Sequence, residues 1–98
     1  MGRRGSALGS ILWSDQASRM LRNLEPTAQE SIRKRTTYLR SMPRMYAMAC
    51  HERFPGCRRF WAEPSCYVYY MVGAGGDDCY IVAITIEEPE EVEEPAAP

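Results

Sequence analysis

Two adjacent arginines in a segment that favours β-strands are the side chains of this sequence most suited to binding an anion. Arg58 and Arg59 follow a Pro-Gly turn and open a series of three short runs rich in Tyr, Val and Ile. A guanidinium can donate two parallel hydrogen bonds to a phosphate or a carboxylate. Adjacent strand residues point to opposite faces, so only one of the two arginines can line a given groove and bind such a group. The alternative is that one arginine is solvated and the other pairs with a carboxylate inside the fold.

Aromatic residues crowd the same segment and suggest a second kind of chemistry. Between residues 60 and 80 they are Phe60, Trp61, Tyr67, Tyr69, Tyr70 and Tyr80. Packing in a sheet explains most of them, because aromatic side chains favour strands. A platform that stacks nucleobases needs two rings on one exposed face beside an arginine. We expect Phe60 and Tyr69 to form that platform if they share a face of the sheet.

The faces of the predicted sheet depend on the register of its turns. Turns symmetric about Pro64 and Gly75 place two sets of side chains on opposite faces: Phe60, Tyr69 and Val82 on one, and Arg59, Tyr70 and Ile81 on the other. A slip of one residue inverts every assignment, since side chains alternate along a strand.

Acid–base, metal and cofactor chemistry have weaker signals in the sequence. His51 is the only candidate for proton transfer near neutral pH, and with no Asp or Ser partner nearby we expect a surface histidine. The cysteines contain no C-x-x-C pair, so we expect no metal site and reduced thiols. Three of them are expected to be small apolar strand residues: Cys57, Cys66 and Cys79. No phosphate-binding loop, nucleophile elbow or dinucleotide fingerprint is present, and no cofactor is expected.

Charge is divided along the chain. All 12 Lys and Arg lie at or before Arg59, whereas most of the 13 Asp and Glu lie after residue 60. A group of basic residues precedes the strands: Arg33, Lys34, Arg35, Arg40 and Arg44. A solvated helix face is the ordinary explanation for such a group, and binding of nucleic acid or an acidic partner is the alternative. The division predicts an anionic partner and an acidic end that competes with it.

The ends of the chain are expected to lie outside its single domain. We expect residues 1–9 to form a flexible basic lead-in and residues 10–86 to form the domain. Residues 87–98, with six Glu and three Pro, are expected to form a disordered acidic tail. The tail's ordinary role is solubility, and the alternative is that it folds back over the basic body. No apolar run approaches the ~20 residues of a membrane span. With reduced thiols, this favours a cytoplasmic protein without a membrane partner.

Two amphipathic segments predict a helical hairpin ahead of the strands. Ser14 is expected to cap the first helix, which Pro26 ends. Its apolar face consists of Ala17, Met20, Leu21 and Leu24. Thr27 and Glu30 match a capping box, which predicts a second helix over residues 28–41. The apolar face of that helix consists of Ala28, Ile32, Leu39 and Met42, and Pro43 ends it.

The strand pattern completes the predicted fold. Residues 10–13 predict an edge strand, and residues 57–62, 67–72 and 79–86 predict an antiparallel meander. Residues 44–53 have no clear period. The fold class expected is therefore α+β: an N-terminal strand, a helical hairpin, then a three-stranded antiparallel meander forming one small sheet.

This order of elements resembles the RelE/ParE superfamily of small bacterial toxins from type II toxin–antitoxin pairs. The first helix is similar to that family over Ser14 to Leu24, and the second at Ile32, Leu39 and Pro43. The strands are similar over Pro55 to Phe60, Tyr67 to Val72 and Tyr80 to Ile84. The match covers about residues 10 to 88, and the order and spacing of the motifs carry it rather than any single motif.

The run from Pro55 to Phe60 is most similar to the ParE-like branch, whose members resemble gyrase poisons. This resemblance implies a protein that is not an enzyme and that inhibits growth by binding DNA gyrase and stabilising cleaved DNA. It also implies a cognate antitoxin that folds a C-terminal segment onto the toxin, giving a hetero-oligomer or a dimer. The residues implied for target or antitoxin binding are Arg33, Arg40, Arg44, Arg58, Arg59, Phe60 and Tyr69.

The same resemblance leaves two other functions open. A RelE-like member would be a ribosome-dependent mRNA endonuclease with ribosome and mRNA as partners. Its transition state would be stabilised by Arg53, Arg58, Arg59 and Tyr69. Many members carry a His or Arg after the last strand, where this chain has Glu87 and Glu88, and this favours the ParE-like branch. The third function is that of a non-toxic relative that only binds an antitoxin.

Overall fold

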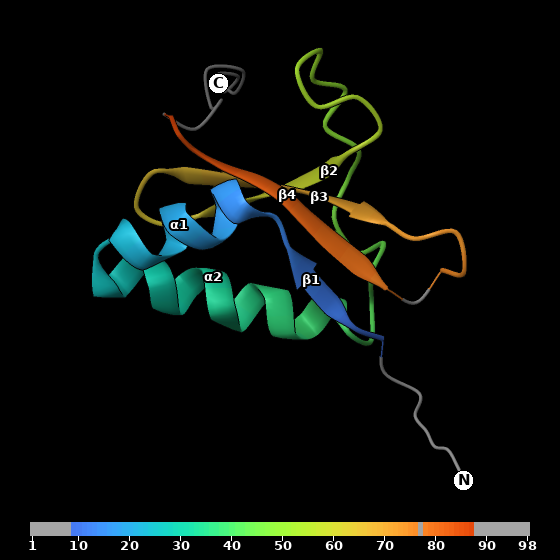
Figure 1. The fold of residues 1–98 in the computed structure, drawn as a ribbon, viewed down its shortest axis with the longest axis horizontal. Coiled ribbons are helices and arrows are strands. Elements are labelled where there is room, and N and C mark those ends of the chain that lie inside the picture. Colours follow the sequence, from blue (N-terminus) through green and yellow to red (C-terminus); the bar gives the residue numbers. More distant parts are fainter. Residues whose placement is uncertain (1–8, 77, 88–98) are drawn as a thin grey trace, which may run out of the picture.

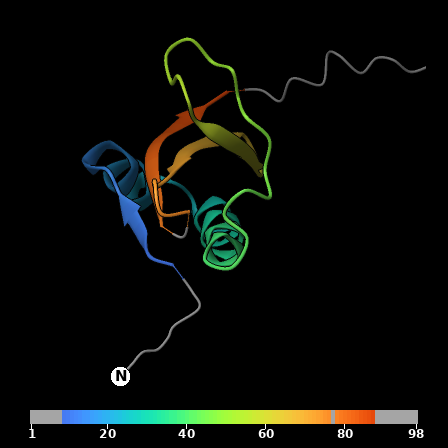
Figure 2. The ribbon, with the colours of Figure 1, turned by 90° about the vertical axis from the view of Figure 1, so that its right-hand side faces the viewer.

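The computed structural model describes residues 9–76 and 78–87, which form two helices and one four-stranded sheet. The elements in chain order are β1 (Ile11–Trp13), α1 (Asp15–Asn23), α2 (Pro26–Leu39), β2 (Arg58–Ala62), β3 (Cys66–Val72) and β4 (Cys79–Ile86). The strand order is β1-β4-β3-β2, with β1 parallel to β4 and the other pairs antiparallel. Both helices lie on one side of the sheet (Figures 1 and 2). Of residues 44–57, Tyr46 near the start packs on the helix side, whereas Ala49, Phe54 and Cys57 pack on the other side.

The predicted α+β fold is confirmed. Each strand begins and ends within one residue of its predicted bounds, and β1 lies at the edge of the sheet. The predicted lead-in, apart from Gly9, and residues 88–98 of the predicted tail lie outside the described residues.

Ser14 positions α1 and joins it to the sheet. Its side-chain oxygen accepts a hydrogen bond from the Ala17 amide at 3.0 Å, which is the predicted cap. The same hydroxyl donates to the Val82 carbonyl in β4 at 2.7 Å. Ala17 and Leu21 are buried, so the predicted apolar face of this helix is confirmed as well.

We expect Ser14→Ala to lower the free energy of unfolding by about 1–2 kcal/mol, because the variant loses both the helix cap and the bond to β4. Urea unfolding followed by circular dichroism measures this. Ser18→Ala, within α1, is the matched control and should leave the unfolding midpoint nearly unchanged. Equal midpoints for the two variants would contradict the capping role.

The start of α2 corrects the predicted capping box. The helix begins at Pro26 with Glu25 at the N-cap and no side-chain cap bond, so Thr27 lies inside the first turn. Proline suits the first helical position because its fixed φ is helical and its missing N–H has no partner there. The helix ends at Leu39 rather than Ser41.

The buried side of α2 is also only partly as predicted. Ala28, Ile32 and Leu39 are buried as expected. Met42 is 51 % exposed because it lies beyond the helix end, and Thr36 takes a buried position instead.

The two faces of the sheet have separate cores. On the helix side the large buried side chains are Leu21, Ile32, Leu39, Phe60, Val68, Tyr70, Ile81 and Ile84. On the other side, Cys57, Tyr67 and Tyr69 are buried and pack with Phe54 and Trp61. Cys57, Cys66 and Cys79 are buried free thiols. The expectation of small apolar strand residues is confirmed for Cys66 and Cys79, whereas Cys57 lies one residue before β2.

The pairing of β2 with β3 corrects the predicted faces. Arg59 lies opposite Tyr69, and Phe60 lies opposite Val68. Directly opposed residues share a face, so Arg59 lies beside Tyr69 and Phe60 lies on the helix side. The predicted platform of Phe60 and Tyr69 is therefore wrong, although Val82 does pack on the Tyr69 side as expected.

Tyr70 makes the stability of the fold sensitive to alkali. Its ring is fully buried, and its hydroxyl donates to the Pro43 carbonyl at 2.8 Å. Burial raises the pKa of Tyr70 to about 12. The unfolded chain therefore loses this proton near pH 10 while the folded chain keeps it, so stability falls as the pH rises from about 10 to 12.

We expect Tyr70→Phe to flatten this alkaline loss of stability. Urea unfolding at several pH values between 8 and 12 measures the slope for both proteins. A residual slope is expected from Tyr69, whose pKa burial also raises. Parallel curves for the wild type and the variant would contradict the role of Tyr70.

Candidate functional site

The face of the sheet opposite the helices brings together charged and aromatic residues from four segments. We define the Arg59 site as Arg59 of β2, Tyr67 and Tyr69 of β3, Glu87 after β4, and His51 from residues 44–57. Contacts between these residues link all four segments. Arg59, Glu87 and His51 are partly exposed, so the site is open to a ligand.

Aromatic rings hold the Arg59 guanidinium against the sheet. Its central carbon lies 4.0 Å from the centre of the Tyr67 ring and 6.0 Å from that of Tyr69. Its Nη1 donates to the Tyr69 hydroxyl at 3.3 Å. Stacking on an aromatic face favours a guanidinium over an ammonium and limits its conformations. Arg59 is therefore a fixed positive charge.

A chain of hydrogen bonds runs from Arg59 through Tyr69 to Glu87. The buried Tyr69 hydroxyl donates to Glu87 Oε2 at 3.2 Å, and the Thr85 hydroxyl donates to the same oxygen. Burial raises the pKa of Tyr69, and the bond from Arg59 opposes that shift. Tyr69 therefore keeps its proton at neutral pH and orients the Glu87 carboxylate.

Residues 44–57 supply His51 and close one side of the site. Backbone bonds tie this segment to β2: the Arg59 amide donates to the Ala47 carbonyl at 3.2 Å. Phe54 stacks on Tyr69 with ring centres 4.4 Å apart. Gly56 has φ of +79°, a conformation that favours glycine at the turn into β2.

His51 is partly exposed, as expected of a surface histidine, and its ring also packs against the site. Its ring is partly buried and meets Tyr69 edge-on, with centres 5.3 Å apart. The Arg53 amide donates to His51 Nδ1 at 3.1 Å. A neutral imidazole carries one N–H, so this bond leaves the proton on Nε2, where it can donate to a ligand.

Only part of the predicted nuclease set lies in this region. Arg59 and Tyr69 are in the site, and Arg53 lies at its rim, with its guanidinium 5.4 Å from the Phe54 ring centre. Arg58 points away, and its Nη1 donates to the Tyr46 carbonyl at 2.7 Å. Of the two adjacent arginines, Arg59 therefore belongs to the site and Arg58 anchors residues 44–57.

The other predicted binding residues lie elsewhere. Phe60 is 3 % exposed in the core on the helix side, away from the Arg59 site, and its contact with a target stays a prediction. Arg33 is exposed on α2, and Arg40 donates from Nε to the Gly9 carbonyl at 3.3 Å. Arg44 is exposed, and its guanidinium lies near Gly76. The roles of these three arginines in target or antitoxin binding stay predictions.

Glu87, Tyr67 and His51 were missed or discounted as site residues by sequence reasoning. Glu87 belongs by composition to the acidic tail, and Tyr67 was grouped with the sheet aromatics. The signal available for Tyr67 was its position two residues before Tyr69, which places both rings on one face.

An exposed apolar strip crosses the same face toward β1. Leu12, Tyr80 and Met71 lie side by side on β1, β4 and β3, and are 60 %, 44 % and 41 % exposed. They line a hollow of about 370 Å³ together with residues of the β3–β4 turn. An exposed apolar strip of this kind suits a protein partner.

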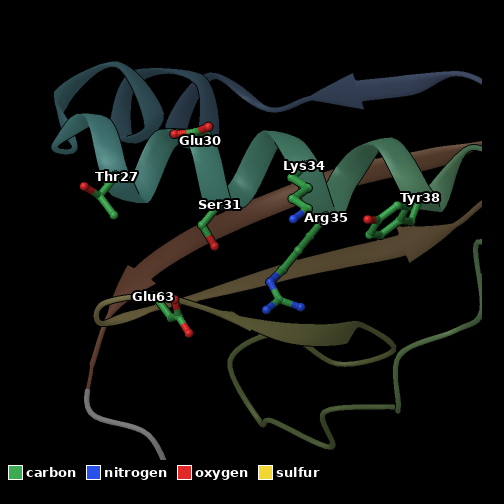
Figure 3. A pocket seen from close by; sticks show the side chains of 7 residues that line it. All are labelled: Thr27, Glu30, Ser31, Lys34, Arg35, Tyr38 and Glu63. Carbon is green, nitrogen blue, oxygen red and sulfur yellow. The ribbon is translucent and has the colours of Figure 1, made fainter.

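A second hollow of about 430 Å³ lies between α2 and the β2–β3 turn. Figure 3 shows Thr27, Ser31 and Arg35 on the side of α2 that faces Glu63. Its lining mixes Lys34 and Arg35 with Glu30 and Glu63, so it does not select a ligand of one charge. It is a weaker candidate than the Arg59 site.

Two other kinds of site were tested in the described residues. Within residues 9–76 and 78–87, no three His, Cys, Asp or Glu side chains come together to hold a metal ion. Neither described helix is long and apolar enough to cross a membrane.

Comparisons with known proteins identify the fold. No protein-family model and no curated protein matches the sequence. A chain of the intact E. coli RelBE toxin–antitoxin complex matches with 17 % identity, over 85 % of this chain and 100 % of that one, at a TM-score of 0.68. The RelBE2 toxin–antitoxin complex of Mycobacterium tuberculosis matches with 12 % identity, over 82 % and 99 % of the chains, at 0.67.

A third match comes from an archaeon. The RelE–RelB complex of Pyrococcus horikoshii matches with 13 % identity, over 83 % of this chain and 96 % of that one, at a TM-score of 0.57. Identities this low establish the fold alone. The chain therefore has the RelE fold.

Proposed function

We propose that this protein is the toxin of a type II toxin–antitoxin pair and acts as a RelE-like, ribosome-dependent mRNA endonuclease. The observation that carries the proposal is the Arg59 site, where the Arg59 guanidinium and the Glu87 carboxylate are both hydrogen-bonded to the Tyr69 hydroxyl. Arg59 binds the phosphate to be cleaved and offsets the charge that develops on it. His51 donates a further hydrogen bond from Nε2.

This proposal replaces the gyrase interpretation as the leading one. The gyrase interpretation depended on the run from Pro55 to Phe60, in which Phe60 is in the core and Arg58 is bonded to the backbone. Of the two arginines and the phenylalanine in that run, only Arg59 belongs to the Arg59 site. The described matches are RelE complexes, and they support the RelE-like alternative better than gyrase binding.

A cognate antitoxin is the proposed partner. The matched RelE proteins are in complexes with RelB antitoxins. The strip of Leu12, Tyr80 and Met71 provides apolar surface on which an antitoxin segment can pack. Arg59 lies on the same face and can pair with an acidic side chain of that segment. Such a segment would cover the site and neutralise the toxin as a hetero-oligomer.

The test is to induce the protein from a tightly repressed promoter in a bacterium. Amino-acid and thymidine incorporation are followed for the first minutes, and mRNA ends are mapped in a cell-free translation system with and without ribosomes. The proposal expects protein synthesis to fall first and new mRNA ends to form only with ribosomes. An earlier fall in DNA synthesis would favour gyrase binding, and unchanged growth would favour a non-toxic antitoxin-binding relative.

A further inference from the structure

Glu87 is a carboxylate where the family resemblance leads one to expect a basic side chain, and it lies in the Arg59 site rather than in solvent. We propose that Glu87 is the general base of this site and removes the proton of a ribose 2′-hydroxyl during RNA cleavage. This inference rests on the proposed nuclease function, and it assigns a catalytic role to a residue that composition places in the acidic tail.

The geometry holds Glu87 in one orientation. The hydroxyls of Tyr69 and Thr85 both donate to Oε2, so Oε1 is the oxygen that can face a substrate. β3 and β4 pair to their ends, with Cys66 opposite Ile86, and the Glu87 amide donates to the Ser65 carbonyl at 2.9 Å. The backbone beneath the carboxylate is therefore fixed as firmly as that of a strand residue.

The spacing between Arg59 and Glu87 suits one nucleotide. The Arg59 guanidinium and the Glu87 carboxylate contact the same Tyr69 hydroxyl, at 3.3 and 3.2 Å. The 2′-hydroxyl of a nucleotide is a near neighbour of its own 3′-phosphate. A phosphate bound by Arg59 therefore places this hydroxyl next to Glu87, within reach for proton transfer.

The reaction balances without a metal ion or redox partner. As Glu87 takes the proton, the 2′-oxygen forms a bond to phosphorus, and the bond from phosphorus to the 5′-oxygen breaks. The 5′-oxygen leaves with that electron pair and takes a proton from solvent water, and Glu87 later returns its proton to solvent. The products are a 2′,3′-cyclic phosphate and a 5′-hydroxyl, and Arg59 stabilises the charge on the pentavalent phosphorus.

An alternative role for the carboxylate predicts the opposite result. If Glu87 mimicked a phosphate and competed for Arg59, its removal would raise the rate of cleavage. If it were the base, its removal would lower that rate about 100- to 10,000-fold, the usual contribution of general base catalysis. The sign of the change decides between the two roles.

The experiment compares Glu87→Gln, Glu87→Asp and Glu63→Gln with the wild type on ribosomes programmed with a defined mRNA. We expect Glu87→Gln to lower kcat with little change in KM, Glu87→Asp to restore part of the rate, and Glu63→Gln, in the exposed β2–β3 turn, to cleave normally. Wild-type products should end in a 2′,3′-cyclic phosphate, and a 2′-deoxynucleotide at the cleavage position should block the reaction. Equal unfolding midpoints for the glutamine variants exclude misfolding.

The possible failures are distinguishable. Wild-type protein that cuts no mRNA overturns the proposed function, and the base role with it. Wild-type cleavage with Glu87→Gln as active overturns the base role alone. A Glu87→Gln variant that is faster than the wild type shows a carboxylate that competes with phosphate, and cleavage of the 2′-deoxy substrate excludes the proposed step.

Discussion

Arg59→Ala should lower the rate of ribosome-dependent mRNA cleavage by about 100- to 1,000-fold, the usual loss when one preorganised donor to a transition-state charge is removed. The expected size follows from the position of Arg59, which stacks on Tyr67 at 4.0 Å and is bonded to Tyr69. Arg59→Lys should recover only part of the rate, because an ammonium cannot donate two parallel bonds. Cleavage by the purified variants in a cell-free translation system measures both effects.

The neighbouring arginine provides an internal comparison. Arg58→Ala should lower the free energy of unfolding by about 1–2 kcal/mol, because it removes the charged donor that holds the Tyr46 carbonyl. Its loss of cleavage should be much smaller than that of Arg59→Ala. Arg19→Ala, on the exposed side of α1, controls for the loss of one positive charge. If Arg58→Ala lost more cleavage activity than Arg59→Ala, the reaction would not take place on the face of the sheet that bears Arg59.

The features that could be predicted from the sequence are those fixed by local chemistry. Ser14 caps α1 because its hydroxyl reaches an amide three residues on, and that spacing is visible in the sequence. The strand bounds follow from runs of Tyr, Val and Ile between turn residues. At the start of α2 two local signals compete, and the fixed φ of Pro26 prevails over the capping box that begins at Thr27.

The predictions that failed concern features that depend on contacts between distant segments. The three-residue turn at Glu63 to Ser65 pairs Arg59 with Tyr69, and so decides which arginine reaches the site. His51 belongs to a segment without a period, so only the folded chain brings it to Tyr69. The sequence assigns Glu87 to the acidic tail because its neighbours are acidic. In the structure, the pairing of β3 with β4 places its carboxylate at the Tyr69 hydroxyl.

Phe60 offers the sharpest test of the core, because sequence reasoning treated it as a contact residue. We expect Phe60→Ala to lower the free energy of unfolding by about 3–5 kcal/mol, the usual cost of removing a buried aromatic ring. Its ring centre lies 4.9 Å from that of Tyr46 and 6.3 Å from that of Tyr70, between α2 and the sheet. Domains are commonly stable by only 5–15 kcal/mol, so a large share of the variant could unfold at 37 °C.

The comparison that separates core from contact is Phe60→Leu, which keeps an apolar side chain in the cavity and should retain most of the stability and all of the cleavage activity. Urea unfolding gives the stability, and cleavage assayed at 10 °C, where more of Phe60→Ala is folded, gives the activity per folded molecule. That activity should match the wild type, because the ring lies across the sheet from Arg59. A stable Phe60→Ala protein with lost activity would instead make Phe60 a contact residue and would invalidate the division of the sheet into a helix-covered core and an exposed Arg59 site.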